Sequence, residues 1–322
     1  MPVLPIGYLF SKHPVRDLTS TIPQRAFDFA QVNATGLLLV NCCRGKESTT
    51  KGISMKGPRL PYRYDHHTWV EIRDIVKEQP VIVLPVGSTE DHGHHLPMDV
   101  DTFLAYSVCD GAAQLIPDQV LLLPALPYGF EDHHMDFPGT ITIRDNHLLD
   151  FVLDITKSVA LHGFKKILIV NGHGSNATIL ETAARRTVIE TDVHCGMLNW
   201  WSVAQPTLWQ IGDSDLQSHA DEIETSVYRY LNDEAVQMDK AAREVKLPIY
   251  KYYWRGWIRG KGASPLRMMD QWSRITDTGV IGDATVATVN KGEQLFTAAA
   301  RELAELITEF RNLPIEPRVD HH

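Results

Sequence analysis

Short apolar runs alternate with longer segments of helical periodicity along most of this chain. Runs in which nearly every position is apolar are typical of parallel strands covered on both faces, whereas half-exposed strands alternate. Four such runs predict buried strands: residues 81–86, 120–126, 166–170 and 194–200. The sequence therefore predicts a sheet that is buried between helices.

Between these runs, apolar residues recur three and four positions apart, as on one face of a helix. The predicted helices span residues 68–78, 101–116, 146–162, 176–191, 221–232 and 291–311. Alternating strands and helices indicate an α/β fold, a three-layer sandwich with a mainly parallel central sheet flanked by helices. Residues 247–276 are rich in aromatics and glycine, follow neither period, and are predicted as a long loop or inserted arm.

The main pattern begins near residue 66. We expect residues 1–65 to form an N-terminal extension packed on the core, and residues 66–322 to form a single α/β domain. With 43% hydrophobic and 22% charged residues, the composition is that of an ordinary globular protein.

The net charge and the length of the apolar runs argue against nucleic-acid and membrane partners. Lysine and arginine number 31 against 40 aspartates and glutamates, a formal net charge of −9, which argues against binding to a phosphate backbone. No apolar run has the roughly 18–20 residues of a membrane span, and the first residues do not resemble a secretory signal. We expect a soluble cytoplasmic protein that acts on a small molecule, without nucleic-acid or membrane partners.

Histidines and carboxylates follow the predicted strands. Glu90 and His92 come after the first strand, His134 after the second and His173 after the third. In an open parallel sheet, ligands bind outside the carboxyl ends of the strands, so these side chains are expected to converge. We therefore expect the functional histidines to be those in these segments, rather than the others among the 15 in the chain.

The spacing within these segments indicates a metal site. Glu90 and His92 are two residues apart, which places them on the same side of an extended segment. A carboxylate and an imidazole together suit Zn, Mn or Fe. Asp101 follows after a turn and is placed to bend back and bridge two ions, and His173 arrives from another strand end, between two glycines.

His219 and Glu224 flank the expected start of a helix near residue 220. In the functional interpretation, His219 faces the site and Glu224 lies one turn into the helix. In the alternative, the acidic residues only complement the helix dipole and His219 is a capping residue. The spacing alone leaves both interpretations open.

Five motifs in order are similar to those of one family: GSTEDHGHHLP at 87–97 with Asp101, HMDFPGT at 134–140, NGHGSN at 171–176, HADEIETS at 219–226, and GVIGD at 279–283. Residues 66–313 thereby resemble the creatininase family of creatinine amidohydrolase-like proteins. The resemblance implies a dinuclear metal hydrolase whose ligands are Glu90, His92, Asp101 and His173, with Asp101 bridging. It also implies that His219 handles the substrate and a proton.

The chain departs from creatininase itself at two places. Ser175 stands where creatininase has a glutamate ligand, so Glu224 or water would have to complete the second ion. The tryptophan that precedes the histidine–alanine motif is also absent, which makes creatinine itself a poor candidate substrate. We expect His219 and Glu224 to act in catalysis, and His134, Ser175, Trp200 and Glu222 to contact the substrate.

The function predicted from the resemblance is a metal-dependent hydrolase with two Zn, Mn or Fe ions per subunit. A metal-bound hydroxide would open a cyclic amide or a related cyclic carbonyl compound, with His219 as proton donor. A homo-oligomer is expected from the resemblance alone. The first alternative is a hydrolase of an oxidised cyclitol, with ring-opening C–C hydrolysis of the 3-dehydro-scyllo-inosose type. The second is a non-catalytic ligand-binding protein that retains the fold.

Overall fold

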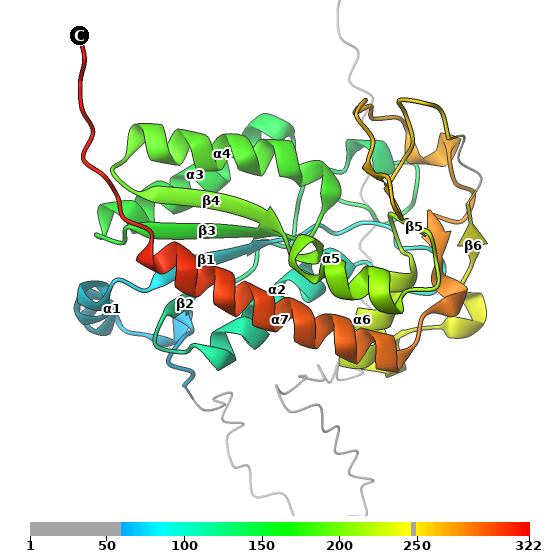
Figure 1. The fold of residues 1–322 in the computed structure, drawn as a ribbon, viewed down its shortest axis with the longest axis horizontal. Coiled ribbons are helices and arrows are strands. Elements are labelled where there is room, and N and C mark those ends of the chain that lie inside the picture. The colour runs from blue at the N-terminus through cyan, green and yellow to red at the C-terminus, as the bar shows by residue number, and fades with distance from the viewer. Residues whose placement is uncertain (1–58, 246–248) are drawn as a thin grey trace, which may run out of the picture. The chain divides into compact units, whose positions relative to one another are not determined.

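The computed structural model describes residues 59–245 and 249–322. Its central sheet contains four strands, all parallel, in the order β2-β1-β3-β4 (Figure 1). The strands are β1 (Val81–Val86), β2 (Val120–Leu122), β3 (Lys166–Asn171) and β4 (His194–Asn199). The bounds of β1 match the predicted run, and those of the other three strands differ from it by one to four residues at one end. The parallel pairing confirms the predicted fold class.

The two faces of the sheet carry separate hydrophobic cores because successive side chains of a strand point to opposite faces. Val83 of β1 belongs to one core together with Val170 of β3. Ile82 and Leu84 of β1 belong to the other, together with Ile169. Every position of β1 and β3 is buried, which explains why β1 and residues 167–170 of β3 are continuously apolar.

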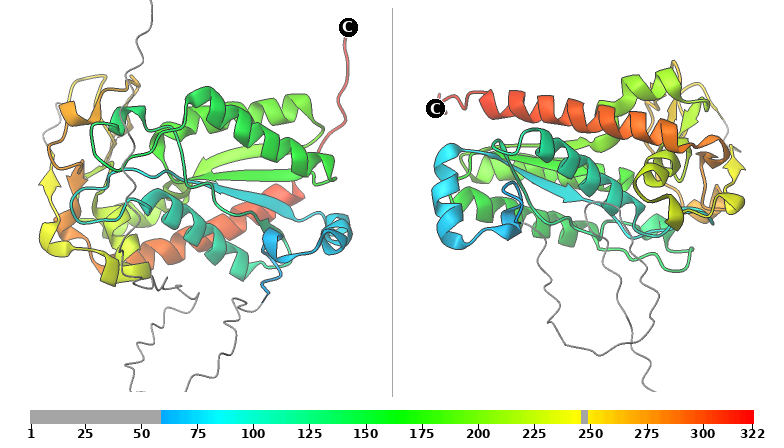
Figure 2. Two further views of the ribbon diagram at one scale, coloured as in Figure 1. Left: turned by 180° about the vertical axis from the view of Figure 1, so that it is seen from behind. Right: turned by 90° about the horizontal axis from the view of Figure 1, so that it is seen from below.

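Helices cover both faces of the sheet and complete the three layers. Helices α2 (Val100–Leu115), α5 (Trp200–Ile211), α6 (Glu222–Asn232) and α7 (Val289–Asn312) contribute to the first core, and α3 (Asp145–Leu161) and α4 (Ala177–Glu190) to the second. Helix α7 lies in front of the sheet in Figure 1 and behind it when the molecule is turned around in Figure 2.

Helix α1 (Trp69–Ile75) precedes the sheet and begins with a capping box, in which Thr68 and Glu71 satisfy each other's backbone N–H groups. Short 3₁₀ helices connect the larger elements. They are η1 (Tyr64–His66), η2 (Val76–Glu78), η3 (Asp132–His134), η4 (Gly174–Asn176), η5 (Asp233–Ala235), η6 (Met238–Lys240), η7 (Trp272–Arg274) and η8 (Ala284–Val286).

Two regions differ from the sequence-based expectation. Helix α5 was not predicted, because Pro206 lies inside it and the preceding apolar run was extended to Trp200. The predicted arm contains two short strands, β7 (Trp257–Ile258) and β8 (Gly262–Ala263), which pair antiparallel with each other. Strand β7 also pairs with β5 (Leu216–Gln217), and β6 (Arg243–Glu244) pairs with β9 (Gly282–Asp283).

A glycine allows a close contact between α6 and α7. A Cβ atom added at Gly292 of α7 would lie 1.9 Å from the backbone oxygen of Ser226 in α6. The missing side chain therefore allows the two helix backbones to touch, and α6 is held against α7 at this point.

Residues 1–58 lie outside the described residues, so an N-terminal extension over residues 1–65 stays a prediction. Within the described ranges, no helix is both long and apolar enough to cross a membrane.

Candidate metal centre

The candidate site lies beyond the carboxyl ends of β1 and β3. Strand β1 pairs with β2 on one side and with β3 on the other, so the chain changes direction across the sheet between them. Such a switch point is where open α/β sheets bind ligands. The strand arrows in Figure 1 point toward this end, where the short strands β5 and β6 also lie.

The first group of potential ligands contains Glu90, Asp101 and His173. The Nδ1 atom of His173 lies 3.0 Å from Glu90 Oε1 and 3.0 Å from Asp101 Oδ2. All three residues are buried. Gly172 makes this approach possible, because a Cβ atom there would lie 2.2 Å from the backbone oxygen of Asp101.

The second group contains His92, Asp101 and Glu224. His92 Nε2 lies 3.1 Å from Asp101 Oδ1 and 3.7 Å from Glu224 Oε2. Asp101 thus belongs to both groups and presents a different oxygen to each. Ser88 holds this carboxylate in place by donating a hydrogen bond of 2.6 Å to its Oδ2 atom.

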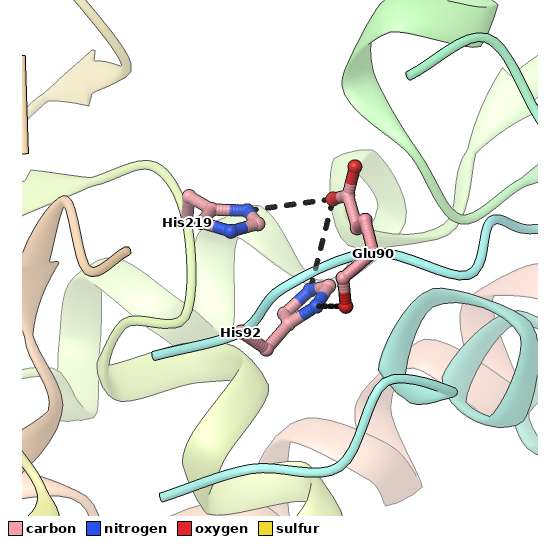
Figure 3. Close-up of side chains that lie close together, drawn as sticks. All are labelled: Glu90, His92 and His219. Atoms are coloured by element: carbon pink, nitrogen blue, oxygen red, sulfur yellow. Dashed lines mark hydrogen bonds and ion pairs between the residues drawn. The ribbon is translucent and has the colours of Figure 1, made fainter. Parts of the chain in front are cut away.

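His219 lies against the same residues. Figure 3 shows the rings of His219 and His92 both near the carboxylate of Glu90, with His219 Nδ1 3.6 Å and His92 Nε2 4.0 Å from its Oε1 atom. The other ring nitrogen of His219, Nε2, lies 2.8 Å from the backbone oxygen of Asp91. His219 therefore faces the site, as the functional interpretation of its motif predicted.

The chain around His219 explains its orientation. Ala220 has a φ of 48°, an unusual left-handed conformation for a residue with a side chain. Asp221 then caps α6 by accepting hydrogen bonds from the N–H groups of Ile223 and Glu224. This sharp turn directs His219 toward β1 and places Glu224 in the first turn of α6.

Four further residues at the site were not predicted. The carboxylate of Glu131 lies 2.7 Å from His173 Nε2, and that of Asp91 lies 2.7 Å from His134 Nδ1. His133 packs edge-to-face against His134, and Trp272 stacks on His134 with ring centroids 4.5 Å apart. The sequence signal that could have identified Glu131 and His133 is their place in FEDHH, which follows the second strand.

The predicted substrate contacts are only partly brought together. His134 lies 3.6 Å from Glu90 Oε2, and Ser175 Oγ lies 2.9 Å from His133 Nε2 at the edge of the group. Trp200 instead begins α5 and is buried in the first hydrophobic core. The carboxylate of Glu222 contacts Lys291 and accepts hydrogen bonds from the backbone of residues 213 and 214, so the structure does not direct it into the site.

Burial and neighbouring charges shift the pKa values of the site residues in different directions on its two sides. Burial would lower the pKa of His92, but the neighbouring Asp101 and Glu224 carboxylates raise it to about 9. The pKa of His173 is also raised well above its ordinary value, because Glu131 and Glu90 outweigh the effect of burial. Burial raises the pKa of Glu90 well above the ordinary value, and that of Glu224 to about 8.

The imidazoles on the other side behave in the opposite way. Burial lowers the pKa of His133 to about 2 and that of His134 to about 4. Burial also lowers the pKa of His219, and the nearby His92 adds to this effect. These three rings are therefore neutral near pH 7.

The residues present fit divalent cations. Neither side-chain oxygen of Glu90 has a partner in hydrogen-bond geometry, although both are buried and His173 Nδ1 lies 3.0 Å from Oε1 as an ion pair. Each of the two groups offers ligand atoms within 4.8 Å of one another, and each combines imidazole nitrogen with carboxylate oxygen. Buried carboxylates that lack donors are costly unless a cation or proton compensates them. The donor set suits Zn, Mn or Fe.

The family model described as "Creatininase: Creatinine amidohydrolase" matches residues 65–307. The chain therefore belongs to the creatininase family. Its relatives in this family are hydrolases, and the chain is a hydrolase of the same family.

Three relatives illustrate the range of the family. A mycofactocin precursor peptide peptidase of Mycobacterium tuberculosis (strain ATCC 25618 / H37Rv) is 31% identical over 73% of this chain and 87% of its own length. A 3-dehydro-scyllo-inosose hydrolase of Thermotoga maritima is 26% identical over 75% and 81%, respectively. A creatinine amidohydrolase of Pseudomonas putida is 26% identical over 75% and 94%.

Solved creatininase structures share the fold. A creatinine amidohydrolase (creatininase) crystal structure superposes with a TM-score of 0.67 at 25% identity, covering 79% of this chain and 99% of the other. A creatininase described as the Mn form gives a TM-score of 0.65 at 26% identity and covers 77% of this chain and 98% of the other. A mutant creatininase is described as Zn-Zn type. These neighbours agree with a site for divalent metal.

Proposed function

We propose that this protein is a metal-dependent hydrolase that cleaves an amide C–N bond of a small molecule or peptide. The observation that carries the proposal is the position of Asp101, whose two carboxylate oxygens belong to two separate groups of ligand atoms. A carboxylate that offers one oxygen to each group is able to bridge two metal ions, and paired ions about 3.5–4 Å apart form two-metal catalytic sites.

In this proposal, Glu90, Asp101 and His173 hold one ion, and His92, Asp101 and Glu224 hold the other. Divalent ions in such a site polarise a carbonyl oxygen and lower the pKa of water. Glu224 supplies the carboxylate that Ser175 cannot, because Glu224 Oε2 lies near His92 while Ser175 is bonded to His133. Glu131 and Asp91 orient His173 and His134 from behind.

His219 is proposed to move the proton. A backbone carbonyl only accepts hydrogen bonds, so the contact with the Asp91 oxygen places the ring proton of His219 on Nε2. The Nδ1 lone pair then faces Glu90 and the centre of the site. Because its pKa is lowered, the ring is neutral at pH 7 and able to accept a proton, which it later returns to the leaving nitrogen.

An amide substrate is favoured by two relatives, one described as a peptide peptidase and one as a creatinine amidohydrolase. The Thermotoga relative supports the second candidate, ring-opening hydrolysis of an oxidised cyclitol. Cyclic amides are the primary proposal, with linear peptides as the other amide class. A cytoplasmic homo-oligomer remains a prediction.

Metal removal tests the proposal. The purified chain is expected to contain close to two equivalents of Zn, Mn or Fe by elemental analysis. At an ion concentration of 100 times the dissociation constant, bound metal would stabilise the fold by about 2.7 kcal/mol, so chelation should lower the melting temperature.

Activity is then assayed on three substrate classes: cyclic amides, short peptides and cyclic polyol ketones. Hydrolysis that is lost on chelation and restored by one of these ions supports the proposal. A metal-free chain that still binds a ligand would favour the non-catalytic alternative. A metal-replete chain that hydrolyses only the ketones would move the assignment to the second candidate.

A further inference from the structure

Trp272 forms one wall of the candidate site and comes from the arm between α6 and α7. Its ring is stacked on His134 at an interplanar angle of 29° and stands perpendicular to His133 and His219, with centroids 5.4 Å and 5.3 Å away. Three imidazoles of the site therefore contact this single indole. No other described tryptophan stacks on a histidine of the site.

The indole carries an unused donor. Its Nε1 atom is buried and has no hydrogen-bond partner among the described residues. An indole N–H can only donate, so its partner must be an acceptor atom. Buried donors are almost always paired in native structures, which makes this orphan a candidate for contact with a ligand.

His133 provides a second unpartnered group beside it. The residue is 4% exposed, and its Nδ1 atom is buried without a partner. Its other nitrogen, Nε2, lies 2.9 Å from the hydroxyl of Ser175. When Ser175 donates to Nε2, the neutral ring carries its proton on Nδ1 and presents a second donor. Trp272 thus offers a hydrogen bond that no described residue accepts, and His133 offers another in the tautomer in which Ser175 donates to its Nε2.

The position of Trp272 is fixed by its neighbours. The Ser273 hydroxyl donates to the carboxylate of Asp136, which joins η7 to the chain immediately after η3. Arg274 pairs with Asp270 at 2.9 Å within the same segment. Thr276 donates to the buried carboxylate of Glu244 at 2.7 Å. The segment is therefore anchored to other parts of the chain just after Trp272, at Ser273 and at Thr276.

Among the described residues, His133 and Trp272 contact Ser175, each other and neighbouring histidine rings rather than a lysine or arginine, so this part of the site offers donors without a formal positive charge. Uncharged donors suit a neutral carbonyl oxygen better than a carboxylate, which would also require a cation. The scissile carbonyl belongs with the ligand groups around Asp101. A second carbonyl of the same substrate could then meet the donors of this wall.

Resting on the proposed amide hydrolysis, we propose that Trp272, with His133 beside it, is a specificity-determining residue that donates a hydrogen bond to a second, non-scissile carbonyl of the substrate. The substrate class is then a compound with two carbonyls close together, such as a cyclic imide, a ring ureide or a peptide backbone. Single-carbonyl lactams fit the same ring volume and leave the indole N–H unpaired.

The test compares two five-membered probes, succinimide with two carbonyls and 2-pyrrolidinone with one. The metal-replete chain is labelled with nitrogen-15 at its tryptophan indoles, and the Trp272 resonance is assigned by its absence in Trp272→Phe. Succinimide is expected to shift this resonance, whereas 2-pyrrolidinone should shift it far less. An unmoved Trp272 resonance with succinimide, or equal shifts with both probes, would overturn the inference.

Binding of the two probes to variants gives a second, independent readout. Trp272→Phe keeps an aromatic ring against His134 but removes the N–H, so the preference for succinimide should fall about tenfold. The matched control is Trp69→Phe, because Trp69 is 76% exposed on α1 and should leave the preference unchanged. An unaltered preference in Trp272→Phe would contradict the assignment.

This test separates the two proposals. Elemental analysis of the same preparation shows whether the ligand groups hold metal, independently of Trp272. If the protein contains metal and hydrolyses amides but Trp272 does not discriminate between the probes, the proposed function stands and the proposed substrate class is rejected. If the protein contains no metal, the proposed function is rejected, whether or not the Trp272 resonance shifts.

Discussion

The pKa values of the histidines on the two sides of the site are shifted in opposite directions, although their rings lie within a few ångströms of one another. On the strand-end side, carboxylates raise the pKa of His92 to about 9 and that of His173 well above its ordinary value. On the loop side, burial lowers the pKa of His133 to about 2 and that of His134 to about 4. The balance between burial and nearby carboxylates decides which charge an imidazole carries, because Asp91, 2.7 Å from His134 Nδ1, does not offset the burial of that ring.

The two sides also differ in how they are supported. The strand-end side is built on the ends of β1 and β3 and on the first turns of α2 and α6. The loop side is built on η3 and η7, which are joined by Ser273 and Asp136. The first arrangement favours a fixed cation geometry, and the second leaves room for the substrate to differ between relatives. The following predictions, in order of decreasing effect, test this division.

The largest effect is expected for Asp101→Asn, which removes the charge shared by both ligand groups. We expect both ions to be lost and activity to fall about 10³-fold or more, since the metals supply several kcal/mol of transition-state stabilisation. Elemental analysis and turnover measure the two effects. The control is Asp118→Asn, at an exposed residue in a turn. Full metal content in Asp101→Asn would remove the basis for a shared ligand.

A smaller effect is expected for Glu224→Gln. This change affects only the second group, so we expect one equivalent of metal to remain and activity to fall about 10²-fold, equal to about 2.7 kcal/mol. Metal titration by calorimetry counts the sites. Two equivalents bound with unchanged affinity would show that another group, not Glu224, completes the second site.

The pH dependence of the unfolding free energy tests the effect of burial on a histidine that is not a proposed metal ligand. His95 is 1% exposed, contacts Thr225 through Nε2 at 2.8 Å, and belongs to neither group of proposed ligands. Burial lowers its pKa to about 4, with a further contribution from the charge on His92. Between about pH 6.5 and pH 4 the unfolded chain therefore binds a proton that the folded chain excludes, and stability falls as the pH falls.

His95→Gln removes this titration while keeping a group that can bond to Thr225. The slope of unfolding free energy against pH in that window should become shallower by at most one proton, about 1.4 kcal/mol per pH unit. Denaturant unfolding at a series of pH values measures both slopes. Parallel curves for the two chains would show that His95 does not contribute to acid sensitivity.

The smallest effect is expected for Ser273→Ala, which removes the bond between η7 and Asp136 and leaves the ligand groups intact. We expect unchanged metal content and a loss of less than about tenfold in kcat/KM, the equivalent of one hydrogen bond. Steady-state kinetics checks this, with Ser158→Ala on α3 as the control. A loss of metal in Ser273→Ala would contradict the separation of the two sides.

Regular structure could be predicted where the sequence pattern is local. The run at 81–86 is apolar throughout because both faces of β1 are buried, and its bounds match β1. The convergence of Glu90, Asp101 and His173 also followed from the sequence, since the carboxyl ends of parallel strands meet at one edge. Whether these residues bind metal stays a prediction.

The remaining parts of the site depend on contacts that the sequence does not encode locally. Trp272 lies in a segment without periodicity, and it stacks on His134 where a hydrogen bond from Ser273 to Asp136 joins two loops that are distant in sequence. Trp200 was expected to face the substrate from a strand end. In the structure it is the first residue of α5, so its ring points into the core.

The contact at Gly292 has a consequence for how this sequence can vary. Helix α7 touches the backbone of α6 at Ser226, two residues after Glu224, and any side chain at residue 292 must push α6 away. Such a substitution would alter the second ligand group while leaving the sheet and the first group in place. If the proposed two-ion site is right, a substitution at residue 292, far from the ligands in sequence, is expected to weaken binding of the second ion and to spare the first.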